Sequence, residues 1–359
     1  LVLVQGLKKP VIRIGRMAGQ YAKPRSSPIE TRDGVTLPSY CGDSINGSPF
    51  TAESRRPDPQ RLIQAQVHAA LTLNFVRALV AGGFADLHHP DHWSLSFLGK
   101  ADLHPTVREA YKRLMDDLGS AIRVMEVVSG RTFERLTTIE FYTSHEGLVL
   151  PQEQALTRRV PRREGFYNLG CHFPWIGDRT RALDGAHVEF FRGIRNPIGV
   201  KVGPTTTAAD VVALADRLDP LREPGRLVLI GRFGASLIEK HLPALVQALQ
   251  AEGRKPVWLC DPMHGNTMTT SSGIKTRHFS NVRAELIRAI EVHKACGSHL
   301  AGVHFELTGE NVTECLGGAG GVREADLDQA YETLCDPRLN YEQAMELVFA
   351  VADKLGNGR

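Results

Sequence analysis

Short apolar runs recur along the chain and are separated by longer stretches in which apolar residues return every three or four positions. The short runs are rich in β-branched residues, which is typical of buried strands, and the longer stretches have the spacing of amphipathic helices. Strands that alternate with helices predict a parallel sheet, and this many repeats favour a (β/α) barrel over a doubly wound open sheet. The expected strands lie at 11–16, 136–142, 165–170, 197–203, 226–232, 255–260 and 301–307.

The clearest helical patterns predict helices at 208–218, 236–253 and 281–297. Gly253 and Gly297 end the second and third of these patterns. Glycine is the preferred residue just beyond a helix C-terminus, because the chain there often adopts a left-handed conformation. We therefore expect both glycines to act as C-terminal caps.

The count of strands and the spacing between them define the expected architecture. Seven runs are present, whereas a closed barrel of this type has eight strands. The opening LVLVQGL has the pattern of the end of a helix, so the first strand is expected upstream of residue 1. A loop rich in Ser, Pro, Gly and Asp and then two long helical patterns separate the first two runs. We predict an α/β fold, one (β/α)8 TIM barrel domain over residues 1–359, with an inserted loop and helical segment at about 26–135.

Composition excludes several classes of function. The chain is 42% hydrophobic and 23% charged with a net charge of +3, so its overall field gives no reason to expect nucleic acid or an anionic membrane as a partner. No apolar run has the roughly 20 residues that a membrane span needs. Neither a Rossmann nor a P-loop glycine motif follows a strand. We expect a cytoplasmic enzyme with six reduced cysteines, and a homo-oligomer in which the inserted helices build an interface.

Basic residues gather at the ends of the predicted strands. In a (β/α) barrel the active site lies at the carboxyl ends of the strands, so these side chains are expected to meet at one mouth. Guanidinium groups bind carboxylate and phosphate through two hydrogen bonds, and lysine adds a point charge. A ring of cations on a nearly neutral protein predicts a substrate with several negative charges. The cations are Arg16, Lys23, Arg25, Arg179, Lys201 and Arg232.

A second set of strand-end residues has the chemistry of a metal site. His264 lies in CDPMHGNT, directly after the run VWL, where Pro262 and Gly265 predict a turn. Glu306 lies in VHFEL and Asp336 in CDPRLN. One imidazole and two carboxylates suit a divalent cation such as Mn²⁺, Fe²⁺, Co²⁺ or Zn²⁺. Taken alone, His264 could equally be a structural histidine and Asp336 could simply begin a turn.

Several motifs in their order along the chain resemble one family. From about residue 10 to residue 353, the chain is similar to the plant-type (class II) 3-deoxy-D-arabino-heptulosonate 7-phosphate (DAHP) synthases. The resemblance implies a (β/α)8 barrel and a metal-dependent condensation of phosphoenolpyruvate with erythrose 4-phosphate, the first step of the shikimate pathway. The motifs are GQYAKPRS, GFYNLGCHFPWIGDRTR, NPIGVKVGP, CDPMHGNT, GIKTRHF, HFELTGENVTECLGG and CDPRLN.

The resemblance also implies a role for each candidate residue. Lys23 would lie near the reacting carbonyl as a proton donor, and Arg25 with Ser26 would bind the phosphate of the aldose. His264, Glu306 and Asp336 would hold the metal, most naturally Mn²⁺, with Co²⁺ or Zn²⁺ as alternatives. The residues implied for phosphoenolpyruvate are Arg16 at the carboxylate, Arg179, Lys201 and Arg232 at the phosphate, and Asp178 and Trp175 beside them.

Two departures from the family pattern leave other functions open. The family's fourth metal ligand is a cysteine on the first strand, which would precede residue 1, and Asp178 stands where glutamate is expected. One alternative is a related synthase that condenses phosphoenolpyruvate with another phosphosugar aldehyde. Another is an inactive barrel that acts as a binding partner.

Overall fold

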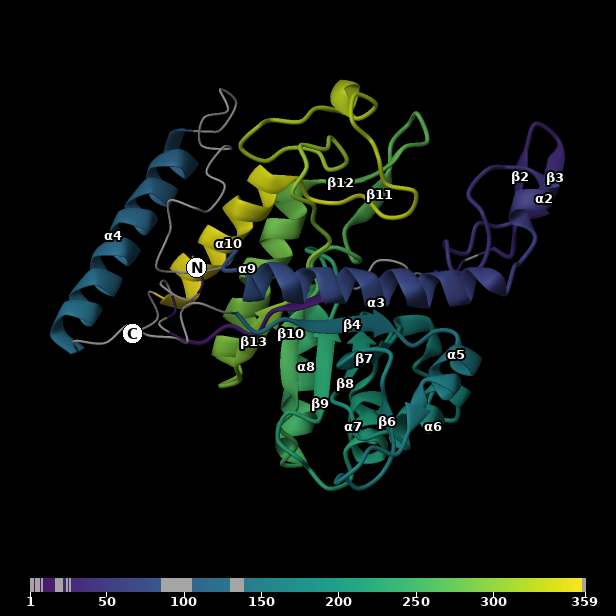
Figure 1. Cartoon of the computed structure of the whole chain (residues 1–359), viewed down its shortest axis with the longest axis horizontal. Helices are drawn as coiled ribbons and strands as arrows, with labels where there is room; N and C mark the ends of the chain where they lie inside the picture. Colours follow the sequence, from purple (N-terminus) through teal and green to yellow (C-terminus); the bar gives the residue numbers. More distant parts are fainter. Residues whose placement is uncertain are drawn as a thin grey trace.

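The computed structural model describes residues 3, 7, 9–16, 22, 23, 25, 27–84, 105–129 and 139–356. Its centre is one parallel sheet whose strands follow one another in chain order, with every neighbouring pair parallel (Figure 1). A doubly wound sheet would reverse its strand order at a switch point, and this sheet does not. The strands are β1 (Ile14–Arg16), β4 (Tyr142–Glu146), β7 (Phe173–Ile176), β8 (Ile198–Val202), β9 (Leu227–Gly231), β10 (Val257–Cys260) and β13 (Leu300–Val303).

The sheet has the form of a curled half-barrel, consistent with the predicted (β/α)8-like fold. Among the described residues β1 and β13 are its two edges. β8 and β9 are buried along their whole length, because side chains on one face point into the barrel and those on the other pack under helices. The expected first strand falls outside the chain, and it stays a prediction, as does the single-domain boundary.

Helices follow the central strands and cover the outer face of the sheet. α7 begins with a capping box in which Thr207 and Asp210 bind each other's backbone N–H groups. Gly253 and Gly297 have φ of 64° and 62°, so both predicted caps are confirmed. The helices packed here are α6 (Ala186–Arg192), α7 (Ala208–Leu218), α8 (Ile238–Ala251), α9 (Phe279–Ala295) and α10 (Tyr341–Gly356).

Two predicted strands are in the wrong place. The strand expected at 136–142 has residues 136–138 outside the described residues, and the strand found nearby, β4, begins at Tyr142. The run at 165–170 contributes only Tyr167–Asn168 (β6), which pairs antiparallel with Thr157–Arg158 (β5), and the sheet strand is β7. For β4 the physical reason is that the strand buries polar side chains with internal partners: His145 binds Glu153 at 2.7 Å, and Thr143 binds His172. A search for apolar runs misses such a strand.

The segment between β1 and β4 holds a hairpin and helices. In the hairpin, β2 (Ile29–Arg32) pairs with β3 (Val35–Pro38). It is followed by α2 (Ala52–Arg55), α3 (Gln60–Ala81) and α4 (Pro105–Ser129). Arg55 is fully buried and ties α2 to the hairpin through Glu30 at 3.1 Å. In Figure 1 α3 runs from the hairpin toward the barrel.

Several smaller elements remain. They are α5 (Leu150–Ala155), the 3₁₀ turns η4 (Asp178–Thr180) and η5 (Glu324–Asp326), and the hairpin of β11 (Thr267–Thr269) with β12 (Lys275–Arg277). Within the part of the chain that the structure describes, no helix has both the length and the apolar character to cross a bilayer.

Candidate active site

A cavity of about 1740 Å³ runs along the inner face of the sheet and reaches the carboxyl ends of its strands. The strands and the loops that follow them therefore bring together residues that lie far apart in the sequence. The predicted residues that line it are Arg16, Lys23, Trp175, Asp178, Arg179, Lys201, Arg232, His264, Glu306 and Asp336.

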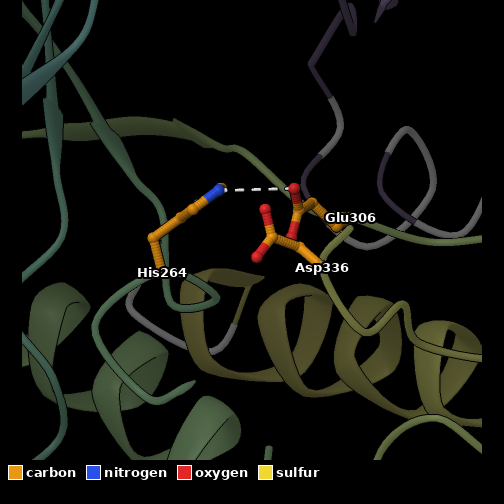
Figure 2. Close-up of side chains that lie close together, drawn as sticks. All are labelled: His264, Glu306 and Asp336. Carbon is orange, nitrogen blue, oxygen red and sulfur yellow. Dashed lines mark ion pairs between the residues drawn. The ribbon is translucent and has the colours of Figure 1, made fainter. Parts of the chain in front are cut away.

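The three predicted metal ligands meet in this cavity. One nitrogen of His264 and one oxygen each of Glu306 and Asp336 all lie within 4.8 Å of one another. Figure 2 shows the imidazole pointing toward the two carboxylates, with its Nε2 3.3 Å from Glu306 Oε1. The three residues come from the β10 loop, the end of the β13 segment and the loop before α10, so only the folded chain can assemble them.

His264 is oriented by a buried carboxylate. Asp261 directly follows β10 and has no exposed surface. Its Oδ2 is 2.7 Å from His264 Nδ1, and its Oδ1 accepts hydrogen bonds from the backbone N–H groups of Met263 and His264 at 3.0 and 3.2 Å. Burial alone would lower the pKa of His264, but Asp261 and Glu306 outweigh it and raise that pKa to about 9. Nδ1 donates to Asp261, and Nε2 faces the metal position, which is the arrangement that tunes metal-binding histidines.

The turn that carries His264 is fixed by close backbone packing. Gly265 lies against the loop after β9, and a Cβ on it would come within 2.3 Å of the Gly234 nitrogen. Asn266 accepts from Ala235 N at 3.0 Å and donates to the carboxylate of Glu285 on α9 at 2.7 Å. Glycine is therefore required here because there is no room for a side chain, and not because the backbone has a positive φ.

The two carboxylates of the group are surrounded by cations. Glu306 Oε2 lies 2.7 Å from Arg277 Nη2, although neither atom makes an aligned hydrogen bond. Asp336 Oδ2 is 3.0 Å from Lys23 Nζ, and its Oδ1 pairs with Lys275. Burial raises the pKa of Glu306 and of Asp336, but neighbouring positive groups outweigh it and hold both pKa values below the usual range. Two ionised oxygens and an imidazole nitrogen, one oxygen lacking an aligned partner, fit a divalent transition metal.

The cations predicted to bind phosphate lie next to this group and are held by acids. Lys201 pairs with the same Asp261 that orients His264. Arg232 donates to Asp178 Oδ2 at 2.9 Å and to the backbone carbonyl of His264 at 3.0 Å. Asp178 has a shorter side chain than the glutamate expected at this position, and it still contacts a basic partner. The residues of the phosphate region and of the metal group are thus linked through shared contacts.

Trp175 forms one wall between two of the cations. The guanidinium carbon of Arg16 lies 5.5 Å from the centre of the indole, and Lys201 Nζ lies 5.9 Å from it. Cations at this distance from an aromatic face are attracted to it. The wall therefore helps to keep both charges directed into the cavity.

A second cavity of about 840 Å³ adjoins the first. Lys23, Arg179 and Lys275 line both cavities, whereas Arg25 lines the second alone. Arg25 is 3.2 Å from Glu30 of the hairpin. Ser26, the remaining predicted residue, lies outside the described residues.

Sequence reasoning missed four residues of the site. Lys275 and Arg277 are on β12, an outlying hairpin and not a barrel strand; both lie in the family motif GIKTRHF, which carried no assigned role. Glu146 lines the cavity at the end of β4, and burial raises its pKa despite the nearby Arg16. A correct boundary for β4 would have identified it. Asp261 was visible in CDPMHGNT but had no assigned role.

Comparison with known proteins agrees with this geometry. Residues 1–352 match the Class-II DAHP synthetase family. A phospho-2-dehydro-3-deoxyheptonate aldolase of Neurospora crassa is 47% identical over 369 residues, covering 98% of this chain and 76% of the relative. A protein of the same name from Streptomyces coelicolor is 48% identical over 352 residues, covering 98% of this chain and 77% of the relative. The chain therefore belongs to the Class-II DAHP synthetase family and is an enzyme of the DAHP synthase type, a transferase.

Proposed function

We propose that the enzyme condenses phosphoenolpyruvate with D-erythrose 4-phosphate and water to give DAHP and phosphate, in a reaction that needs a divalent metal. This is the first step of the shikimate pathway, which leads to aromatic amino acids. The observation that carries the proposal is that a His-Glu-Asp group lies in the same cavity as a ring of cations. Two phosphorylated substrates and a carbonyl that must be polarised need both features at once.

Phosphoenolpyruvate is assigned to the cations around Trp175. Arg16 would bind the carboxylate, and Arg179, Lys201 and Arg232 would bind the phosphate. Each of the last two already has a carboxylate partner, Asp261 for Lys201 and Asp178 for Arg232. These acids hold the cations in position before the substrate arrives. The two cationic side chains are thus already ordered in the folded protein, so substrate binding does not have to offset the entropy lost in ordering them.

The aldose is assigned to the boundary between the two cavities. Its phosphate would bind Arg25 and Lys275 in the second cavity, with Ser26 as a further partner, and Arg179 borders both cavities. Its aldehyde would then extend toward the His-Glu-Asp group. Burial lowers the pKa of Lys23, which lies 3.0 Å from Asp336, and this favours transfer of its proton to the alkoxide that forms from the aldehyde.

His264, Glu306 and Asp336 would hold the metal, and Mn²⁺, Co²⁺ and Zn²⁺ all suit this donor set. When bound, a divalent cation supplies Lewis-acid polarisation of the aldehyde carbonyl. The chain's own residues orient phosphoenolpyruvate so that its C3 faces the aldehyde, while water adds at C2 and phosphate departs toward Lys201 and Arg232.

The test is an assay of phosphoenolpyruvate consumption with a panel of phosphorylated aldoses and Mn²⁺. We expect erythrose 4-phosphate to be the preferred aldose, with one phosphate released for each phosphoenolpyruvate consumed. Preference for another aldose would support the alternative synthase. No consumption with any aldose and any of the three metals would refute the proposal.

A further inference from the structure

The segment that carries Asp336 has no regular structure of its own. Residues 332–338 form neither helix nor strand, yet Asp336 must sit within bonding distance of a metal held by two other elements. A segment without a helix or strand ladder leaves its backbone N–H groups to find partners elsewhere. The partners it uses therefore decide how precisely Asp336 is placed.

Most of these partners belong to one side chain, Glu314. Its carboxylate has no exposed surface. Oε1 accepts from the backbone N–H groups of Glu332 at 3.1 Å and Thr333 at 2.9 Å, and Oε2 accepts from that of Arg338 at 2.7 Å. The guanidinium of Arg338 adds two further bonds, at 3.0 and 2.6 Å. These contacts hold the segment on both sides of Asp336, at residues 332–333 before it and at Arg338 after it.

Glu314 itself does not face the reaction. It lines neither the large cavity nor the second one, so it is not placed to touch a substrate or a metal. On the far side, Arg277 bonds to the carbonyl of Pro337 and also approaches Glu306. The Asp336 segment is thus held against the same framework that carries the second carboxylate ligand.

We propose that Glu314 is a positioning residue for the metal centre, fixing residues 332–338 so that Asp336 completes the ligand set. This inference rests on the proposed metal site. Three backbone bonds to one ionised carboxylate are charge-assisted and hence stronger than bonds to a neutral group. Replacing Glu314 by Gln keeps the shape but removes the charge and places an amide N–H₂ against N–H donors. The segment then shifts, and Asp336 moves with it.

The chain offers a matched control in Glu153. This glutamate is equally buried, and its carboxylate is bonded to His145 at 2.7 Å and Asn168 at 2.6 Å, away from the Asp336 segment. Glu153→Gln therefore disturbs the fold by a similar chemical change without touching residues 332–338. A purely structural role for Glu314 predicts that the two variants lose stability and leave metal binding equally unaffected.

The experiment measures the Kd for Mn²⁺ by the electron paramagnetic resonance signal of free Mn²⁺, in the full chain, without substrate. The variants are Glu314→Gln, Glu153→Gln and Asp336→Asn, with Arg338→Gln as a milder disruption of the same contact should Glu314→Gln not fold. Loss of a group that orients a ligand typically weakens metal binding about 10- to 100-fold. We expect that range for Glu314→Gln, about tenfold for Arg338→Gln, and no more than about twofold for Glu153→Gln.

The outcomes separate this inference from the proposal beneath it. If Asp336→Asn weakens Mn²⁺ binding and Glu314→Gln or, where that variant does not fold, Arg338→Gln leaves it unchanged, the inference is overturned and the metal site stands. If Asp336→Asn also binds Mn²⁺ like the wild type, the ligand assignment fails and the inference fails with it. An equal loss in Glu314→Gln and Glu153→Gln would likewise overturn it, because general destabilisation would then be the cause.

Discussion

Replacing Asp261 by Asn should disturb both halves of the active site. The carboxylate is fully buried and faces Lys201 and His264 Nδ1 with the same oxygen. An amide of the same shape removes the charge, so Lys201 becomes a buried cation without its counter-ion. An amide also has only one acceptor oxygen, so it cannot accept both from the backbone N–H groups of Met263 and His264 and from His264 Nδ1.

The magnitude follows from these contacts. Breaking a buried ion pair by removing one partner costs about 3–5 kcal/mol, because the other charge is left uncompensated. Lys201 is 5% exposed, so solvent relieves little of this cost. Loss of the carboxylate behind a metal-binding histidine weakens metal affinity about 10- to 100-fold. The variant should therefore lose both unfolding free energy and Mn²⁺ affinity.

The assay is urea unfolding at neutral pH together with Mn²⁺ titration. Glu291→Gln is the control, since Glu291 and its partner Lys354 are 51% and 42% exposed, and such surface pairs contribute about 0–1 kcal/mol. If Asp261→Asn unfolded at the wild-type urea concentration and bound Mn²⁺ with wild-type affinity, the reasoning would be refuted.

Three further predictions concern single residues. Arg232→Ala should chiefly raise the KM for phosphoenolpyruvate in steady-state assays, because the guanidinium faces the proposed phosphate position; an unchanged KM removes it from that role. Gly265→Ala should lower Mn²⁺ affinity in the same titration, since its Cβ would collide with the Gly234 backbone, and wild-type affinity would show that the turn can adapt. Burial lowers the pKa of His293 from 6.5 to about 4, so the folded chain binds fewer protons than the unfolded chain between these pH values. The stabilising contribution of neutral His293 is present above pH 6.5 and is lost as pH falls toward 4, at about 3 kcal/mol. His293→Phe should therefore flatten the fall in urea stability over that range, and an identical slope in both proteins would contradict the assignment.

Much of the fold was predictable because the central strands are buried on both faces. Such strands read as apolar runs, and β8, β9 and β10 lie within predicted runs. β13 overlaps its predicted run at 301–307 only over residues 301–303. β4 was misplaced because its buried Thr143, Ser144 and His145 are polar and satisfied within the protein. A hydrogen bond to a residue far along the chain, such as the one between Thr143 and His172, leaves no pattern in the local sequence.

The site was predictable where its residues follow apolar strands closely, as Arg232 and His264 do. The chain could not show which acids would pair with the cations. Asp261 and Lys201 are 60 positions apart, and Glu314 grips a segment that begins 18 residues later. Such contacts depend on how the loops fold over the barrel mouth, which hydrophobic periodicity does not encode.

We propose that His264, Glu306 and Asp336 form the metal site of a phosphoenolpyruvate condensation. The most direct measurement is the rate of phosphoenolpyruvate loss with erythrose 4-phosphate, for chelator-treated wild type and Glu306→Gln, before and after Mn²⁺ is added. We expect no rate in the chelated wild type, recovery on addition of Mn²⁺, and little recovery in Glu306→Gln. Equal rates with and without metal, or full recovery in Glu306→Gln, would contradict this assignment of the metal site.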